Sequence, residues 1–290
     1  MFFFSSLRSS STKLSFKIAP YCLSKVNSSL NPPAFNLARI VKETCGEDDF
    51  LMHLSDESSL FGVADGVGGW TSQGIDPKLF TSALIQSIKS EFSTSFQSPL
   101  VDLVEKAYEK MRLERKEIRF GSCTLALLNF DSSTSLLKSY NLGDSGFLVV
   151  RDGKIVWKST EQQHYFNAPF QIGLNDGAPA DSPLKGDTSV FSVRSGDVLV
   201  VGTDGLFDNL FEEEILKVVA QHSSQKDADS FVQEVARDLT MKAKRIGESQ
   251  TAASPFAKKA LEDGKYFRGG KNDDTTVLVA IFARSEKSEL

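Results

Sequence analysis

Four acidic segments carry the chemistry that this sequence suggests. Asp65 follows an apolar run in FGVADGVGGW (residues 61–70), and Asp204 ends another in VLVVGTDG (residues 198–205). Asp273 directly precedes the apolar end of NDDTTVLV (residues 272–279), and Glu47 and Asp48 lie in GEDD, before a further apolar run. A buried carboxylate needs a partner, and a cation is the usual one. Each Asp-Gly pair also has a purely local interpretation as a turn, because both residues are favoured there.

The four segments would form a metal site if the fold brings them together. Three or four carboxylates in one cleft cannot all ionise unless cations neutralise them. Oxygen ligands without cysteine or histidine select a hard ion, Mg²⁺ or Mn²⁺, over zinc. Gly66 and Gly205, which follow two of the aspartates, would let the backbone and a hydrated ion approach closely.

The strands and helices that must position these carboxylates follow one another in groups of one kind, and do not alternate along the chain. We expect strands at residues 49–55, 59–64, 122–130, 134–143, 146–159, 198–202 and 275–283, with a hairpin turn at Asp152-Gly153. We expect helices at residues 77–92, 100–111, 212–222 and 227–246. Blocked rather than alternating elements favour antiparallel sheets covered by helices. The predicted fold class is therefore α+β, with one domain over residues 36–290.

Composition excludes several classes of protein. The chain has 290 residues and a net charge of −5, which argues against a surface that neutralises nucleic-acid phosphates. No apolar run reaches the length of about 18 residues that a membrane-spanning helix needs. The three cysteines (Cys22, Cys45 and Cys123) are an odd number without a CxxC pair, so we expect neither a disulfide nor a zinc site on sulfur. We therefore expect the protein in a reducing compartment.

The N-terminal segment differs in composition from the rest of the chain. Residues 1–42 contain no Asp or Glu, are rich in serine and carry six basic residues. This is typical of an organellar transit peptide. Basic residues among Phe, Leu and Ile favour a mitochondrial presequence over a chloroplast one, and we assign residues 1–35 to it. The alternative is a Ser-rich tail without a targeting role.

Six motifs together resemble one family. GEDD (46–49), VADGVGG (63–69), GSCTLALL (121–128), NLGDSGFLV (141–149), TDGLFDN (203–209) and NDDTTVLV (272–279) are similar, in order and spacing, to the motifs of the metal-dependent type-2C (PPM) protein phosphatases. The resemblance covers about residue 36 to the C-terminus. It is greatest to the small mitochondrial branch of that family.

The resemblance implies a fold, a reaction and a set of ligands. The fold would be two antiparallel β-sheets packed face to face and flanked by helices. The reaction would be hydrolysis of phosphoserine and phosphothreonine by a water that two ions, Mg²⁺ or Mn²⁺, activate between them. The implied metal ligands are Asp65, which bridges both ions, the Gly66 carbonyl, Asp204 and Asp273 at the first ion, Glu47 with Asp48 beside it at the second, and Asp144 at a weaker third ion. Asp65, Asp204 and Asp273 would be the catalytic set.

The sequence departs from the family pattern at two positions. Val67 stands where many members have a histidine that acts as proton donor, and the arginine that binds substrate phosphate is missing from the region of Glu43 and Thr44. We consider His164, in TEQQHYFNAPFQ, as a general acid, because an unperturbed histidine titrates near 6.5. The alternatives are that His164 only orders its loop and that a metal-bound water is the acid. Arg39, Lys42 and Arg268 are the candidate phosphate ligands; each has an alternative as a surface charge.

The expected biology follows from the resemblance. Substrates would be phosphoproteins of the mitochondrial matrix, among them metabolic and quinone-biosynthesis proteins, and the enzyme would be a monomer. A catalytically silent relative that only binds partners is the main alternative, although it would usually lose the ligands that this chain keeps. A Mg²⁺-dependent nuclease is a weaker one, because no basic groove is evident.

Overall fold

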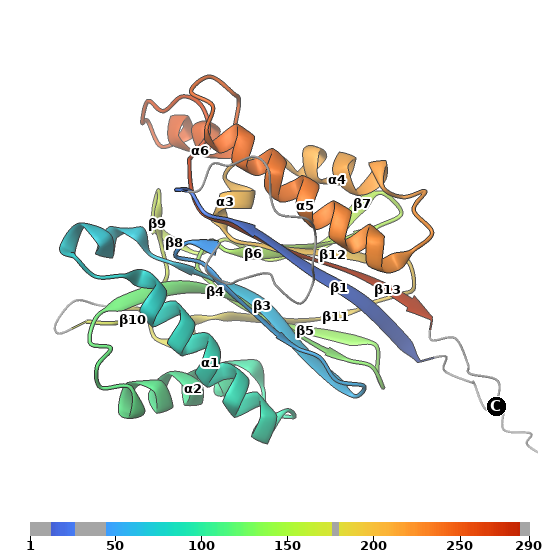
Figure 1. Cartoon of the computed structure of the whole chain (residues 1–290), viewed down its shortest axis with the longest axis horizontal. Helices are drawn as coiled ribbons and strands as arrows, with labels where there is room; N and C mark the ends of the chain where they lie inside the picture. The colour runs from blue at the N-terminus through green and yellow to red at the C-terminus, as the bar shows by residue number, and fades with distance from the viewer. Residues whose placement is uncertain (1–12, 27–44, 176–179, 285–290) are drawn as a thin grey trace, which may run out of the picture.

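Two antiparallel sheets packed against each other form the centre of the molecule. The computed structural model describes residues 13–26, 45–175 and 180–284 (Figure 1). The first sheet has the order β1-β13-β12-β6-β7, with strands Leu14–Leu23, Thr275–Arg284, Val198–Gly202, Gly146–Arg151 and Lys154–Lys158. The second has the order β11-β5-β4-β3-β2, with strands Asp187–Ser192, Leu136–Leu142, Gly121–Asp131, Ser58–Gly66 and Asp49–His53, and with β10 (Ile172–Leu174) paired to β4. The predicted α+β architecture of two face-to-face sheets is confirmed.

Helices cover the outer faces of both sheets. Figure 1 shows α1 (Pro77–Ser95) and α2 (Leu100–Glu114) on the outside of the second sheet, and α4 (Glu212–Gln221) and α5 (Ala228–Gly247) on the outside of the first. The predicted starts are correct: Asp76 caps α1 through the Lys78 N–H, and Asp227 caps α5 through the Ser230 N–H. Shorter elements complete the order: α3 (Asp204–Phe207), α6 (Pro255–Glu262), the hairpin β8 (Gln163–Tyr165) and β9 (Ala168–Pro169), and the 3₁₀ turns Gly68–Gln73 and Pro183–Lys185.

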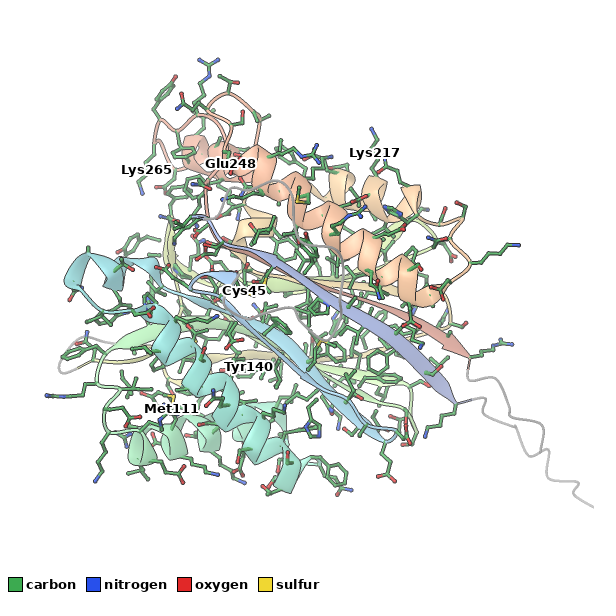
Figure 2. All side chains as sticks on the ribbon, viewed as in Figure 1. Cys45, Met111, Tyr140, Lys217, Glu248 and Lys265 are labelled. Atoms are coloured by element: carbon green, nitrogen blue, oxygen red, sulfur yellow. A yellow bond between two sulfur atoms is a disulfide. The ribbon has the colours of Figure 1, made fainter. Side chains whose placement is uncertain are left out.

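Three apolar clusters hold these layers together. One lies between the two sheets, around Phe61, Phe130 and Phe282. A second joins α1 and α2 to the second sheet, and a third joins α4 and α5 to the first. Met111 and Tyr140, both fully buried, belong to the second cluster (Figure 2). The layers are therefore rigid supports for the strand ends, where the acidic residues lie.

The N-terminal boundary that we predicted at residue 35 is wrong for the fold. Leu14–Leu23 forms β1, which pairs with β13 over ten residues, from Leu14 opposite Arg284 to Leu23 opposite Thr275. Its inner residues Ala19 and Tyr21 are 1% and 7% exposed. The folded domain therefore includes part of the predicted presequence. Whether the N-terminal segment is a targeting signal stays a prediction, and residues 1–12 and 27–44 lie outside the described residues.

The expectation of free cysteines is also wrong for two of the three. Cys22, near the end of β1, and Cys45 form a disulfide with Cα atoms 5.1 Å apart. An odd number of cysteines does not exclude one disulfide with the third cysteine left free, and Cys22 also fell in the segment assigned to the presequence. Cys123 is a buried free thiol, and burial raises its pKa well above the ordinary value. Over the described ranges, none of the helices has the length and apolar character to cross a membrane.

Candidate metal centre

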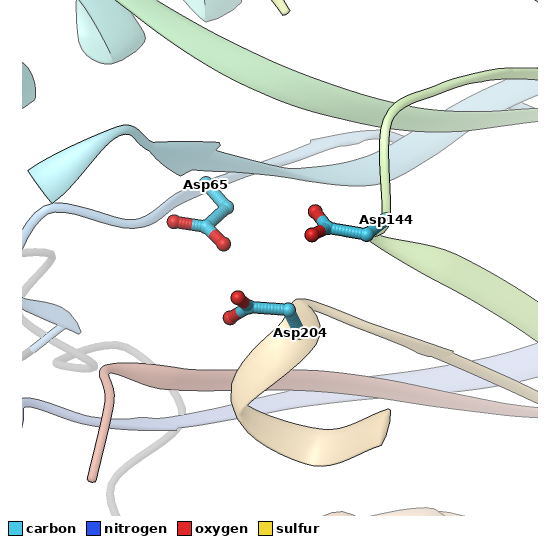
Figure 3. Close-up of side chains that lie close together, drawn as sticks. All are labelled: Asp65, Asp144 and Asp204. Atoms are coloured by element: carbon cyan, nitrogen blue, oxygen red, sulfur yellow. The ribbon is translucent and has the colours of Figure 1, made fainter. Parts of the chain in front are cut away.

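Three of the predicted carboxylates converge at one end of the two sheets. Asp65 lies at the end of β3, Asp144 in the turn between β5 and β6, and Asp204 at the first position of α3. One oxygen of each lies within 4.8 Å of the other two. Figure 3 shows the three side chains pointing toward a common centre from these elements. The strand-end pattern predicted that Asp65 and Asp204 would meet, whereas Asp144 was expected here only from the family resemblance.

Strand register explains the convergence. Asp65 pairs with Thr124 of β4 in the second sheet, and in the first sheet Gly202 of β12 pairs with Gly146 of β6. Asp144 lies just before β6, and Asp204 lies just after β12, the strand that pairs with β6. The two aspartates therefore lie at the same end of the first sheet. Thr124 and Ser145 share a hydrogen bond of 2.7 Å between their hydroxyls, which joins the two sheets beside the trio.

A second acidic group adjoins the trio. Asp48 is fully buried and accepts a hydrogen bond of 2.9 Å from the Thr203 hydroxyl. Asp274 is 2% exposed and accepts the N–H groups of Glu47 and Lys25, at 2.9 and 2.6 Å. It thereby ties the GEDD loop to the start of β13. Asp273 and Glu47 are half-buried at the same edge.

The carboxylates destabilise one another's charged forms. Burial raises the pKa of Asp65 well above its usual range, and repulsion from Asp204, then Asp48, adds to it. Burial and Asp274 raise the pKa of Asp48, and burial and Asp204 raise that of Asp144. Three buried oxygens, Oδ1 of Asp48, Asp144 and Asp204, have no hydrogen-bond partner among the described residues. A buried acceptor without a donor is costly, so these atoms fit a site that a cation completes.

Two lysines supply positive charge at this cluster. Lys271 Nζ contacts Asp204, lies 3.1 Å from Asp208 Oδ2 and 3.5 Å from Asp273 Oδ2. Lys25 Nζ lies 2.7 Å from Glu47 Oε2 and 3.3 Å from Asp273 Oδ1. The surrounding carboxylates raise the pKa of Lys271 well above the usual lysine value despite its burial. Both ammonium groups are therefore charged and partly offset the acidic cluster.

The glycines of the motifs permit close contacts. A Cβ on Gly66 would lie 2.7 Å from the Glu47 carbonyl oxygen, and one on Gly205 would lie 2.0 Å from the Asp274 carbonyl oxygen. Gly46 has φ +65°, and a Cβ there would lie 2.2 Å from Asp274 Oδ1. Each glycine therefore lets one acidic segment pack against the next.

Sequence reasoning missed several residues of the site. Lys25 lay in the predicted presequence, and Lys271 was not singled out. Asp208 is 6% exposed and lies four residues after Asp204, a spacing that places both on one face of a helical turn. That spacing in TDGLFDN was the available signal.

Other candidates lie outside the carboxylate group. His164 Nε2 is 2.8 Å from Asp181 Oδ2, and its ring packs on Phe170 with centroids 4.3 Å apart. None of the contacts described for His164 reaches the acidic cluster. Arg268 is exposed. Arg39 and Lys42 lie outside the described residues.

Comparisons with known proteins agree with this geometry. The family model of stage II sporulation protein E (SpoIIE) matches residues 55–282. The protein phosphatase PTC7 homologue of Xenopus laevis is 37% identical over 245 residues, which cover 82% of each chain. The X-ray structure of the photosystem II phosphatase PBCP superposes with a TM-score of 0.75 at 27% identity, over 92% of this chain and 98% of that one. The catalytic domain of the serine/threonine protein phosphatase PstP, solved with two manganese ions, has a TM-score of 0.55 at 17% identity, over 93% of this chain and 99% of that one, which supports the fold alone.

The fold, the acidic cluster and these matches define the class of protein. The chain belongs to the PP2C-type family of metal-dependent protein serine/threonine phosphatases. The Xenopus protein is similar over 82% of the chain, so the family resemblance seen in the sequence is confirmed.

Proposed function

We propose that this chain hydrolyses phosphoserine and phosphothreonine in proteins at a centre of two divalent ions, Mg²⁺ or Mn²⁺. The observation that supports this most is the trio of carboxylates within 4.8 Å of one another, with unpartnered buried oxygens on Asp144 and Asp204. When bound, such ions would lower the pKa of a water between them and neutralise the phosphate. The proposed ligands are those of the sequence analysis: Asp65 shared by both ions, the Gly66 carbonyl, Asp204 and Asp273 for one, Glu47 with Asp48 beside it for the other, and Asp144 for a weaker third.

The chain's own residues hold these ligands in place. Thr71 donates a hydrogen bond of 2.9 Å to Glu47 Oε1, while Lys25 binds the other oxygen. Thr203 fixes Asp48, and the Thr276 N–H in turn donates to the Thr203 hydroxyl at 3.1 Å. Because phosphoryl transfer depends on positioning and charge neutralisation, these contacts define which oxygens face the substrate.

Phosphate release tests the proposed function. The full chain should release phosphate from a phosphoserine peptide with Mn²⁺ and lose that activity in a chelator. Asp204→Asn should abolish both turnover and calorimetric Mn²⁺ binding, whereas Asp56→Asn, a substitution at an exposed turn, should change neither. A chain that folds and binds Mn²⁺ but releases no phosphate would instead support the catalytically silent alternative.

We keep His164 as the proposed general acid for the leaving serine oxygen. Its side chain is 46% exposed, which gives the ring access to solvent protons, and Asp181 fixes its orientation. His164→Ala should slow phosphoserine hydrolysis by about 10² or more yet barely affect an aryl phosphate, whose leaving group needs no proton. Equal losses on both substrates would mean that His164 only orders the β8–β9 hairpin.

We also propose a mitochondrial location and phosphoprotein substrates of the matrix. The acid-free composition of the N-terminal segment supports this, as does the similarity to PTC7 homologues. The location can be tested by fractionating cells that express either the full chain or a chain that lacks residues 1–12. Retention of the shortened chain in mitochondria would show that the signal lies elsewhere.

A further inference from the structure

Lys25 stands at the open edge of the acidic cluster, two residues beyond the end of β1. Its ammonium lies 2.7 Å from Glu47 Oε2, 3.3 Å from Asp273 Oδ1 and 3.7 Å from Asp274 Oδ2. The side chain is 30% exposed. A partly solvated cation therefore lies at the edge of the acidic cluster.

The backbone of Lys25 is fixed on both sides. Its N–H donates to Asp274 Oδ1 at 2.6 Å, and its carbonyl accepts from Lys244 Nζ at 3.1 Å. Asp274 and Lys244 are each 2% exposed. Three residues earlier, the disulfide ties Cys22 to Cys45, next to the GEDD loop. Most of the freedom of this lysine is thus confined to its side chain, which points at the cluster.

The two lysines of the cluster differ in what else they contact. Lys271 is 19% exposed, reaches Asp208 as well as Asp204, and lies 5.3 Å over the ring of Phe256. Among the described residues, the Lys25 ammonium contacts the carboxylates at the edge of the cluster, and a Cβ on Gly68 of the exposed Gly68-Gly69 pair would lie 3.4 Å from Lys25 Nζ. Lys271 is therefore held within the cluster, whereas the more exposed side chain of Lys25 lies at its edge, beside a residue without a side chain.

We propose that Lys25 is the residue that binds the phosphate of the substrate, in place of the arginine that the sequence lacks. This inference rests on the proposed function, because ions bound by Glu47 and Asp273 would take up the charge that these carboxylates now share with Lys25. The ammonium would then keep Asp274, at 3.7 Å, and gain the phosphate oxygens as a further anionic partner. An ammonium is a compact point charge that binds phosphate well.

Phosphate binding by charge variants of the full chain tests the proposal. Lys25→Met removes the charge and keeps the length, and Lys25→Arg keeps the charge. In the presence of Mn²⁺, calorimetric binding of inorganic phosphate should weaken about 10- to 100-fold in Lys25→Met, the range of one hydrogen bond to a charged group, and only a few-fold in Lys25→Arg. Lys17→Met is the matched control. Lys17 lies on β1, eight residues before Lys25, which is about 26 Å of extended chain at 3.3 Å per residue, and it pairs with Asp229.

The Mn²⁺ affinity separates this role from a structural one. Removal of a competing ammonium should leave Mn²⁺ binding equal or tighter in Lys25→Met. Unchanged phosphate binding in that variant, or weaker binding of Mn²⁺ and phosphate together, would overturn the proposal. If Lys25→Met does not fold, as judged by thermal unfolding, Lys25→Gln replaces it with the same expectation. A wild-type chain that binds phosphate through Lys25 but hydrolyses no phosphopeptide would refute the proposed function and support the phosphate site.

Discussion

Replacement of Asp65 by asparagine should stabilise the ion-free chain and abolish the stabilisation that divalent ions give. Asp65 has two like-charged neighbours, Asp144 and Asp204, with oxygens within 4.8 Å. Two unit charges at that distance would repel by about 3.5 kcal/mol at an effective dielectric constant of about 20, and the raised pKa values of Asp65 and Asp144 mean that protonation relieves part of this repulsion. Lys271 offsets part of the charge on Asp204. We therefore expect Asp65→Asn to stabilise the ion-free chain by about 2 kcal/mol, or by about 4–8 °C in Tm for a domain of this size.

Ions should stabilise the wild type and not the variant. A ligand at 100 times its Kd adds about 2.7 kcal/mol to the free energy of unfolding. With Mn²⁺ the wild type should therefore become the more stable protein, and in chelator the variant should be. Scanning calorimetry of both chains under both conditions decides this, with Asp56→Asn at an exposed turn as control. A variant that is less stable in chelator, or that gains as much from Mn²⁺ as the wild type, would refute the electrostatic reasoning.

Three further predictions follow from the packing. Deletion of residues 1–26 should abolish the thermal transition because it removes β1 from β13, whereas deletion of residues 1–12 should leave it within about 2 °C; equal transitions in both would show that β1 is dispensable. Asp197→Ala should lower the free energy of unfolding by about 3 kcal/mol in urea, because Asp197 is 1% exposed and binds Arg151 through both oxygens at 2.7 and 2.6 Å; a loss below about 1 kcal/mol, the scale of a surface ion pair, would contradict this. Gly46→Ala should weaken Mn²⁺ binding in calorimetry, because its Cβ would displace Asp274 and with it Glu47; unchanged affinity would show that this loop does not hold a ligand.

The sequence was sufficient where a local pattern determines the structure. The apolar stripe from Phe80 to Phe92 and the Asp76 cap predicted α1, and Asp152-Gly153 predicted its hairpin, where both residues have positive φ. Asp65 and Asp204 could be recognised as candidate ligands because a carboxylate directly after a buried strand needs a partner, usually a cation. Composition could not locate β1, since the strand is stabilised by its pairing with β13 at the other end of the chain.

Contacts between residues that lie far apart in the sequence could not be predicted from local patterns. The partner of Cys22 depends on where β1 ends, and the charge that faces Glu47 comes from Lys25, 22 positions earlier. The neighbours Asp273 and Asp274 differ in their contacts: Asp274 binds backbone N–H groups, whereas Asp273 lies 3.3 Å from the Lys25 ammonium and 3.5 Å from that of Lys271. Both residues precede β13, so strand alternation does not assign their directions, and only the fold shows what each one contacts.

The pairing of the first strand with the last sets the order in which the molecule can be completed. During synthesis, β1 emerges first, and its partner β13 follows about 260 residues later, on the order of 10–50 s at 5–20 residues per second. In that interval β1 and one edge of β12 both lack the neighbour that each has in the finished sheet. A chaperone that binds β1 in that interval therefore competes with a single strand partner, which is made about 260 residues later.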